Sequence, residues 1–154
     1  MTLTTTPTAR TDTEAAPAPL PSLSGLHHLG LTVRDIDQSE RWYADVLGMT
    51  RVFVEDHPTG GGHTVVINRA DTFLFLGLDY HPQADLERFD ERRTGLDHVA
   101  MSVDSRADLD AWAHRLDALG VEHGPIHDQD QPVHATLVVS DPDGIPVELF
   151  WTAG

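Results

Sequence analysis

Two histidines occupy equivalent positions in a segment that the chain repeats. "GLHHLGLTVRD" begins at Gly25 and "GLDHVAMSVDS" begins at Gly95, which places His28 and His98 70 residues apart. A lone histidine in an apolar run is more often a hydrogen-bonded core residue than a metal ligand. Two copies related by a pseudo-two-fold axis, however, would place the imidazoles symmetrically about that axis, where they need a partner between them. The repetition therefore favours a metal site over two unrelated core histidines.

A third candidate ligand lies near the C-terminus. Glu148 stands among apolar residues in "DPDGIPVELFW", where an unpaired charge would be costly. Two neutral imidazoles and one carboxylate are the ligands of the facial arrangement associated with non-heme Fe(II), which leaves positions open for substrate and oxygen. We therefore expect His28, His98 and Glu148 to bind a divalent metal. Fe(II) is the first candidate, and Zn(II) and Mn(II) are the alternatives.

The first histidine belongs to a strand that is followed by a helix pattern. The apolar run 26–33 predicts a short buried strand. In "RDIDQSERWYADVLGM", capping residues at the start, an apolar stripe and Gly48 near the end predict an amphipathic helix. Three strand-like runs follow, separated by turn signals: Thr50–Val54, His63–Ile67 and Thr72–Leu78. The predicted order of this first unit is β-α-β-β-β.

The second copy has the same predicted order. Its strand is "GLDHVAMSV", and its helix is "SRADLDAWAHRLDALG", with Ser105 and Asp108 spaced as an N-terminal cap. Three further strands are predicted: Val121–Ile126, His134–Val139 and Ile145–Trp151. One unit alone would bury only one face of its sheet, so we expect the two units to pair around a common core.

Composition restricts the classes of function. The formal charge of −15 opposes binding to nucleic acid. It suits cationic small molecules, although simple solubility is the more common reason for such a charge. The absence of cysteine excludes disulfides and thiolate chemistry. No secretory signal and no apolar stretch long enough for a membrane span are present. We expect a cytoplasmic protein whose partner is a small-molecule substrate, with no nucleic acid or membrane partner.

Composition and the repeat also indicate the domain boundaries. Residues 1–24 are rich in Thr, Pro and Ala and are expected to form a disordered arm. Residues 25–154 are expected to form one domain, with module 1 at about 25–80, a linker at 81–94 that holds a short helical turn, and module 2 at about 95–152.

Together, "HHLGLTVRD", "SERWYADVLGM", "DHVAMSVD" and "DPDGIPVELFW" resemble the vicinal oxygen chelate superfamily, over about residues 25–152. This superfamily includes glyoxalase I, extradiol dioxygenases, fosfomycin-resistance enzymes and bleomycin-resistance proteins. The resemblance implies an α+β fold of two βαβββ modules that form a curved, partly open mixed sheet around a metal-binding pocket. It implies metal ligands at His28, His98 and Glu148, and a homodimer, because similar members often form dimers.

Two departures from the family bear on activity. Glyoxalase I-like members carry a fourth ligand at a position that corresponds to about Phe75, which cannot bind a metal, and this favours a three-ligand, dioxygenase-like site. Extradiol dioxygenases carry a tyrosine where Val138 stands and a histidine near Gln129, and neither is present. The sequence therefore supports cleavage of a catechol ring less well than it supports membership of the superfamily.

These features leave three hypotheses about function. The first is a metal-dependent enzyme, Fe(II) dioxygenase-like, that chelates its substrate through two neighbouring oxygens. The second is a drug-sequestering protein of the bleomycin-resistance type, and the third is a glyoxalase-like lyase or isomerase. His63 and His134 are candidate acid/base residues, and exposed strand-end histidines without a chemical role are the alternative. Phe75, Tyr80 and His81 are candidate substrate contacts.

Overall fold

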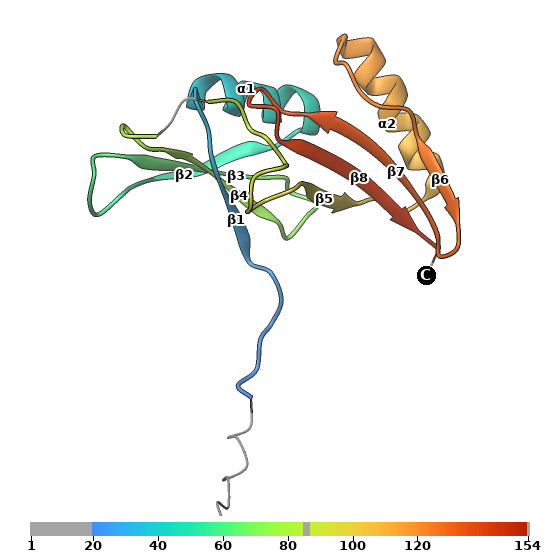
Figure 1. The fold of residues 1–154 in the computed structure, drawn as a ribbon, viewed down its shortest axis with the longest axis horizontal. Coiled ribbons are helices and arrows are strands. Elements are labelled where there is room, and N and C mark those ends of the chain that lie inside the picture. Colours follow the sequence, from blue (N-terminus) through green and yellow to red (C-terminus); the bar gives the residue numbers. More distant parts are fainter. Residues whose placement is uncertain (1–19, 85–86, 154) are drawn as a thin grey trace, which may run out of the picture.

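The chain folds into two βαβββ modules with the same order of elements, as the sequence predicts (Figure 1). The computed structural model describes residues 20–84 and 87–153. Module 1 contains β1 (His28–Thr32), α1 (Ile36–Leu47), β2 (Thr50–Asp56), β3 (His63–Asn68) and β4 (Phe75–Tyr80). Module 2 contains β5 (Val99–Ser102), α2 (Arg106–Leu119), β6 (His127–Asp130), β7 (Val133–Ser140) and β8 (Pro146–Thr152).

Each module forms a four-stranded mixed sheet. The strand orders are β1-β4-β3-β2 and β5-β8-β7-β6, and the first pair of each sheet is parallel while the other pairs are antiparallel. Each helix packs on its own sheet, α1 mainly on β4 and α2 on β7 and β8. β1 and β5 are therefore sheet edges, and each sheet keeps one face that its own helix does not cover.

Local sequence signals set the helix ends where they were predicted. Asp35 caps α1 by accepting a hydrogen bond from the Gln38 N–H, and α1 ends at Gly48 with φ 72°. Ser105 and Asp108 form the expected capping box of α2, in which each side chain bonds the other residue's backbone N–H. These bonds satisfy N–H groups that have no partner within the helix.

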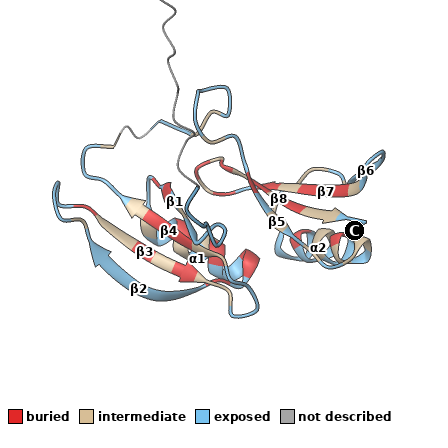
Figure 2. Ribbon diagram, turned by 90° about the horizontal axis from the view of Figure 1, so that it is seen from below, coloured by how far each residue is buried: buried red, intermediate tan, exposed pale blue. Residues whose placement is uncertain are grey.

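The apolar residues of the helix-facing sheet surfaces form one buried cluster shared by both modules. In β7 and β8 every second residue is buried, as expected for strands with one face on a core. The outer strands differ, since β2 and β6 are exposed along their whole length (Figure 2). The described residues contain no helix that is both long and apolar enough to cross a membrane.

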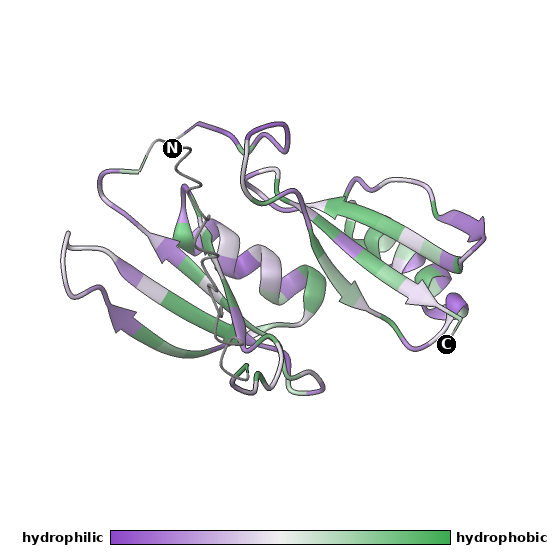
Figure 3. Ribbon diagram, turned by 60° about the horizontal axis from the view of Figure 1, so that its bottom comes forward, coloured by the Kyte–Doolittle hydropathy of each residue, from purple (hydrophilic) through white to green (hydrophobic). Residues whose placement is uncertain are grey.

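Two predicted strands are placed incorrectly. The strand expected at Val121–Ile126 lies instead at His127–Asp130, because the Val121 N–H bonds back to the helix carbonyl of Leu116. The strand expected from Thr72 begins only at Phe75, because Thr72 closes a turn onto the Arg69 carbonyl. Figure 3 shows β6 as hydrophilic, so it carries no apolar signal that would place it from sequence.

The other predictions of organisation fall partly outside the described residues. Most of the predicted disordered arm, residues 1–19, lies outside them, and residues 20–24 have no secondary structure. In the described part of the linker no helix is present; two turns occur instead, closed by Ala84 N–H to His81 and by Arg93 N–H to Asp90.

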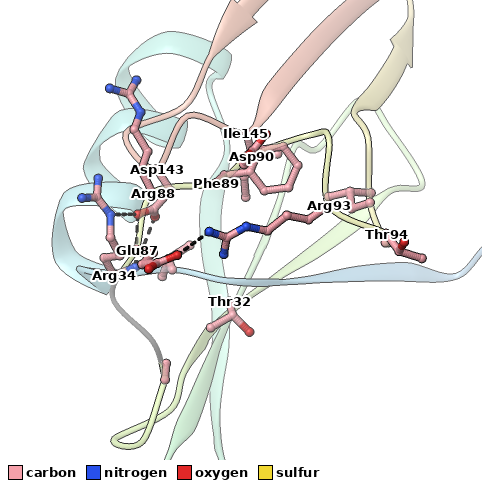
Figure 4. Close-up of a pocket in the computed structure, with 14 residues that line it drawn as sticks. Thr32, Arg34, Glu87, Arg88, Phe89, Asp90, Arg93, Thr94, Asp143 and Ile145 are labelled. Atoms are coloured by element: carbon pink, nitrogen blue, oxygen red, sulfur yellow. Dashed lines mark hydrogen bonds and ion pairs between the residues drawn. The ribbon is translucent and has the colours of Figure 1, made fainter.

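Polar contacts join module 1 to the turn between β7 and β8. The Arg34 guanidinium pairs with Asp143 (Nε to Oδ1 2.5 Å) beside a cavity of about 290 Å³ that the linker also lines (Figure 4). The hydroxyl of the fully buried Tyr43 donates to Asp141 Oδ2 at 3.2 Å. Burial raises the pKa of Asp141, although the backbone N–H groups that donate to its carboxylate lower it. Burial and the neighbouring charge of Asp141 both raise the pKa of Tyr43. Tyr43 with Asp141 and Arg34 with Asp143 therefore form a polar latch between the modules.

Candidate metal centre

Two of the three predicted metal ligands meet on the open face of module 2. The parallel pairing of β5 with β8 places Ala100 opposite Glu148, and His98 immediately precedes β5. His98 Nε2 lies 3.7 Å from Glu148 Oε2. The strand neighbours of Glu148, Val147 and Leu149, point to the core, so Glu148 points to the opposite, open face. Its side chain is 19% exposed there.

Asp97 orients the His98 ring. Its carboxylate lies 2.6 Å from His98 Nδ1, so Nδ1–H donates to Asp97 and Nε2 is the ring nitrogen that faces Glu148. The hydrogen bond to Asp97, followed by the charge of Glu148, raises the pKa of His98. A carboxylate that accepts the second ring N–H is the usual partner of a metal-binding histidine. The sequence analysis did not single out Asp97, although its position beside a candidate ligand was the available signal.

The third predicted ligand, His28, lies apart from this pair. It is the exposed first residue of β1, and its Nδ1 is 3.0 Å from that of His27. Among the described residues, the ligand atoms of His28, His98 and Glu148 do not all lie within 4.8 Å of one another in a single chain. The structure therefore brings two members of the triad together and leaves the third on the other sheet.

The strand register identifies the module 1 counterpart of Glu148. Gly30 faces Gly77 in the β1–β4 pair, just as Ala100 faces Glu148 in the β5–β8 pair. Gly30 and Ala100 are equivalent in the repeat. Gly77 is thus the counterpart of Glu148, whereas Phe75 lies opposite His28. A glycine cannot bind a metal through a side chain, so module 1 offers no fourth ligand at this position.

The other candidate residue of module 2, His134, lies on the same open face. In the β7–β8 register His134 pairs with Thr152, and the next pair on the same face is Thr136 with Phe150. Its ring stacks on Phe150 with centroids 5.2 Å apart and an interplanar angle of 11°. Nδ1–H donates to the Pro132 carbonyl at 2.8 Å, which leaves Nε2 as an acceptor. His134 therefore has the face and the tautomer that a base requires.

The module 1 candidates are dispersed. His63 and Tyr80 are register partners with ring centroids 5.5 Å apart, and their alternation with the core residues places them on the opposite face from Asp79. Phe75 stacks on His27 with centroids 5.8 Å apart. His81 lies against His57, away from His28. The structure thus separates the candidate acid/base residue His63 from the open face.

Known proteins share this architecture. The Glyoxalase/Bleomycin resistance protein/Dioxygenase superfamily matches residues 25–149. A catechol-2,3-dioxygenase of Bacillus subtilis is 31% identical, over 80% of this chain and 41% of its own length. A probable lactoylglutathione lyase of Synechocystis sp. is 26% identical, over 83% of this chain and 95% of its own length. The crystal structure of a glyoxylase/bleomycin resistance protein/dioxygenase domain from Frankia sp. is 33% identical with a TM-score of 0.75, covering 86% of this chain and all of that one. The repeat, the paired βαβββ modules and these matches show that the chain belongs to the glyoxalase/bleomycin resistance protein/dioxygenase superfamily.

Proposed function

We propose that the protein is a metal-dependent enzyme that binds its substrate through two neighbouring oxygens, with His28, His98 and Glu148 as the metal ligands. The observation that supports this most strongly is the pair of His98 and Glu148, 3.7 Å apart, with Asp97 fixing the tautomer of the histidine. Two imidazoles and a carboxylate suit Fe(II), and Zn(II) and Mn(II) accept the same donors. The bound metal would act as a Lewis acid and, if iron, would activate oxygen.

The position of His28 leads us to propose a homodimer. His28 is exposed on β1, an edge strand, and His98 precedes β5, the edge strand of the other sheet. Unpaired edges are where a second chain can add to a sheet. In a two-fold dimer, His28 of one copy would meet His98 and Glu148 of the other, and two equivalent centres would form.

The residues around the pair have separate roles in this proposal. Asp97 keeps the lone pair of His98 Nε2 directed at the metal position. Gly77 supplies no fourth ligand, so more coordination positions remain open for substrate oxygens, which favours a dioxygenase-like reaction over a lyase. His134, with Nε2 free to accept, would take a proton from a substrate hydroxyl. The stacked Phe150 would present an apolar surface to a substrate ring.

A drug-binding protein is the second candidate, and one cavity favours it. A cavity of about 590 Å³ lies between the modules, with apolar residues such as Met49 and Trp112 and the carboxylates of Asp71 and Asp104 in its lining. Its volume is in the range of small-molecule sites. A cationic drug would match Asp104 and the charge of −15, whereas Asp71 is already paired with Arg69, which also lines the cavity.

Metal dependence separates the two candidates. Protein purified without a chelator would be analysed for metal, then titrated by calorimetry with a panel of catechols and hydroquinones before and after EDTA treatment, with oxygen uptake recorded in parallel. The enzyme hypothesis predicts metal in the wild type, a lower metal content per chain in Glu148→Ala and His98→Ala, and loss of substrate affinity after chelation. His114→Ala, which removes an exposed histidine of α2, is the control. Ligand binding that survives EDTA unchanged would favour the drug-binding protein.

A further inference from the structure

A second group of metal-binding side chains lies outside the proposed metal centre. His57 follows β2, Asp79 lies in β4, and His81 follows β4. One ligand atom from each lies within 4.8 Å of the others. His57 Nε2 is 3.2 Å from Asp79 Oδ1, and the two histidine rings are 4.6 Å apart between centroids.

This group is too far from His28 for one ion to serve both. The β1–β4 register pairs His28 with Phe75 and Thr32 with Asp79. Asp79 is therefore four residues further along the sheet than His28, which is about 13 Å at roughly 3.3 Å per residue. The two groups lie at opposite ends of the sheet of module 1.

Two glycines leave the space that the His57 and Asp79 side chains occupy. A Cβ on Gly30 would lie 2.8 Å from Asp79 Oδ2, and one on Gly62 would lie 2.6 Å from His57 Nδ1. Because any larger residue at Gly30 or Gly62 would displace these side chains, the carboxylate and the imidazole are held within a shaped recess.

Thr64 orients the carboxylate. Its hydroxyl donates to Asp79 Oδ1 at 2.5 Å and lies 3.0 Å from His57 Nε2. An outer hydrogen bond of this kind fixes a ligand before a metal binds. The side chains of His57 and Asp79 are only 19% and 20% exposed, whereas His81 is exposed. The recess therefore opens to solvent on the His81 side, where an ion can enter.

We propose that His57, Asp79 and His81 bind a divalent transition metal of the Zn(II) type. Two imidazole nitrogens and one carboxylate oxygen are donors that Zn(II) accepts at about 2.0–2.2 Å, with water as the fourth ligand. Ligand atoms at such distances from one ion are about 3.3 Å apart in a tetrahedron, close to the separation of His57 Nε2 and Asp79 Oδ1. The ion takes the place of the proton between those two atoms, and the exposed His81 side chain closes onto it.

The bound ion would join two connecting segments at the end of module 1. His57 opens the turn between β2 and β3, and His81 begins the linker to module 2. A metal bridge between them stabilises the folded state, because an ion that binds only the folded chain shifts the folding equilibrium. The proposed role is thus structural, and it is independent of the proposed enzymatic function.

The test uses untagged full-length protein carrying His98→Ala, so that the proposed metal centre does not contribute. Zn(II) titration by calorimetry is expected to give one site per chain, and Zn(II) is expected to raise the melting temperature. Adding His81→Ala or Asp79→Asn should weaken binding by more than ~10-fold, since a direct ligand is lost, and should abolish the thermal shift. Adding His114→Ala should change neither.

Each alternative outcome is decisive. Asp79→Asn keeps the size of the side chain, so a loss of binding in both Asp79→Asn and the exposed His81→Ala is not a folding defect. No Zn(II) binding in the His98→Ala protein would overturn the proposal, and so would binding that His81→Ala and Asp79→Asn leave unchanged. Loss of a catalytic function in His98→Ala, by contrast, bears only on the proposed metal centre.

Discussion

Two variants that each lack metal at the proposed centre are expected to regain it there when they are assembled together. In the proposed dimer, each centre takes His28 from one copy and the pair of His98 and Glu148 from the other. A His28→Ala dimer and a Glu148→Ala dimer each contain no intact centre. A heterodimer contains one intact and one doubly damaged centre. Random assembly gives about half heterodimers, so the mixture should regain about one quarter of the wild-type centres.

The assay compares metal content per chain in co-refolded and separately refolded samples, measured by elemental analysis after dialysis. The second group of ligands around Asp79 contributes equally to both samples, so the difference reports only the proposed centre. A mixture of His98→Ala with Glu148→Ala is the matched control, since both changes damage the same half of each centre and no combination repairs it. If His28 instead reached His98 and Glu148 within its own chain, mixing would restore nothing and the dimer proposal would fail.

Three further predictions concern the latch between the modules and the helix cap. Tyr43→Phe removes a buried hydrogen bond to Asp141 and should lower the free energy of unfolding in urea by ~1.5–3 kcal/mol, the scale for a bond to a charged group; an unchanged midpoint would contradict this. Burial raises the pKa of Asp141, so the folded chain keeps the Asp141 carboxyl protonated to a higher pH than the unfolded chain does. The stability that the protonated carboxyl contributes is therefore lost as pH rises through the folded pKa. Relative to wild type, Asp141→Asn should therefore gain stability between about pH 4, the ordinary aspartate value, and neutrality, and a gain as the pH falls would refute the sign. Ser105→Ala breaks the capping box of α2 and should cost ~0.5–2 kcal/mol in the same urea assay, whereas an unchanged stability would show that the cap is dispensable.

Signals that lie close together in the sequence were sufficient for the helices. A cap needs only residues three apart, and a terminal glycine needs only its own backbone conformation, so Ser105, Asp108 and Gly48 were identified correctly. The edge strand β6 was misplaced because its sequence "HDQD" is polar and fully exposed. It exists through pairing with β7, which a local pattern does not reveal.

The candidate site was predictable to the extent that the repeat marks it. Equivalent positions pointed to His28 and His98, and a carboxylate among apolar residues pointed to Glu148. The structure brings His98 and Glu148 to 3.7 Å. The group of His57, Asp79 and His81 was missed because it depends on register. Asp79 is 22 residues from His57 in sequence, and only the hairpin of β2 and β3 with the pairing of β3 to β4 brings them together.

Because side chains alternate along each strand, the core residues and the candidate site residues lie on opposite faces of each sheet. On β8, Val147 and Leu149 face the core while Glu148 faces the open side, and on β4, Leu76 and Leu78 face the core while Gly77 faces the open side. The cores of the two modules can stay alike while their open faces differ, since substitutions on the open face create no cavity in the core. Module 2 has a carboxylate where module 1 has a glycine, so each chain carries only one copy of the His98 and Glu148 pair. In the proposed dimer, one pair per chain and one His28 per chain would give one complete centre for each chain.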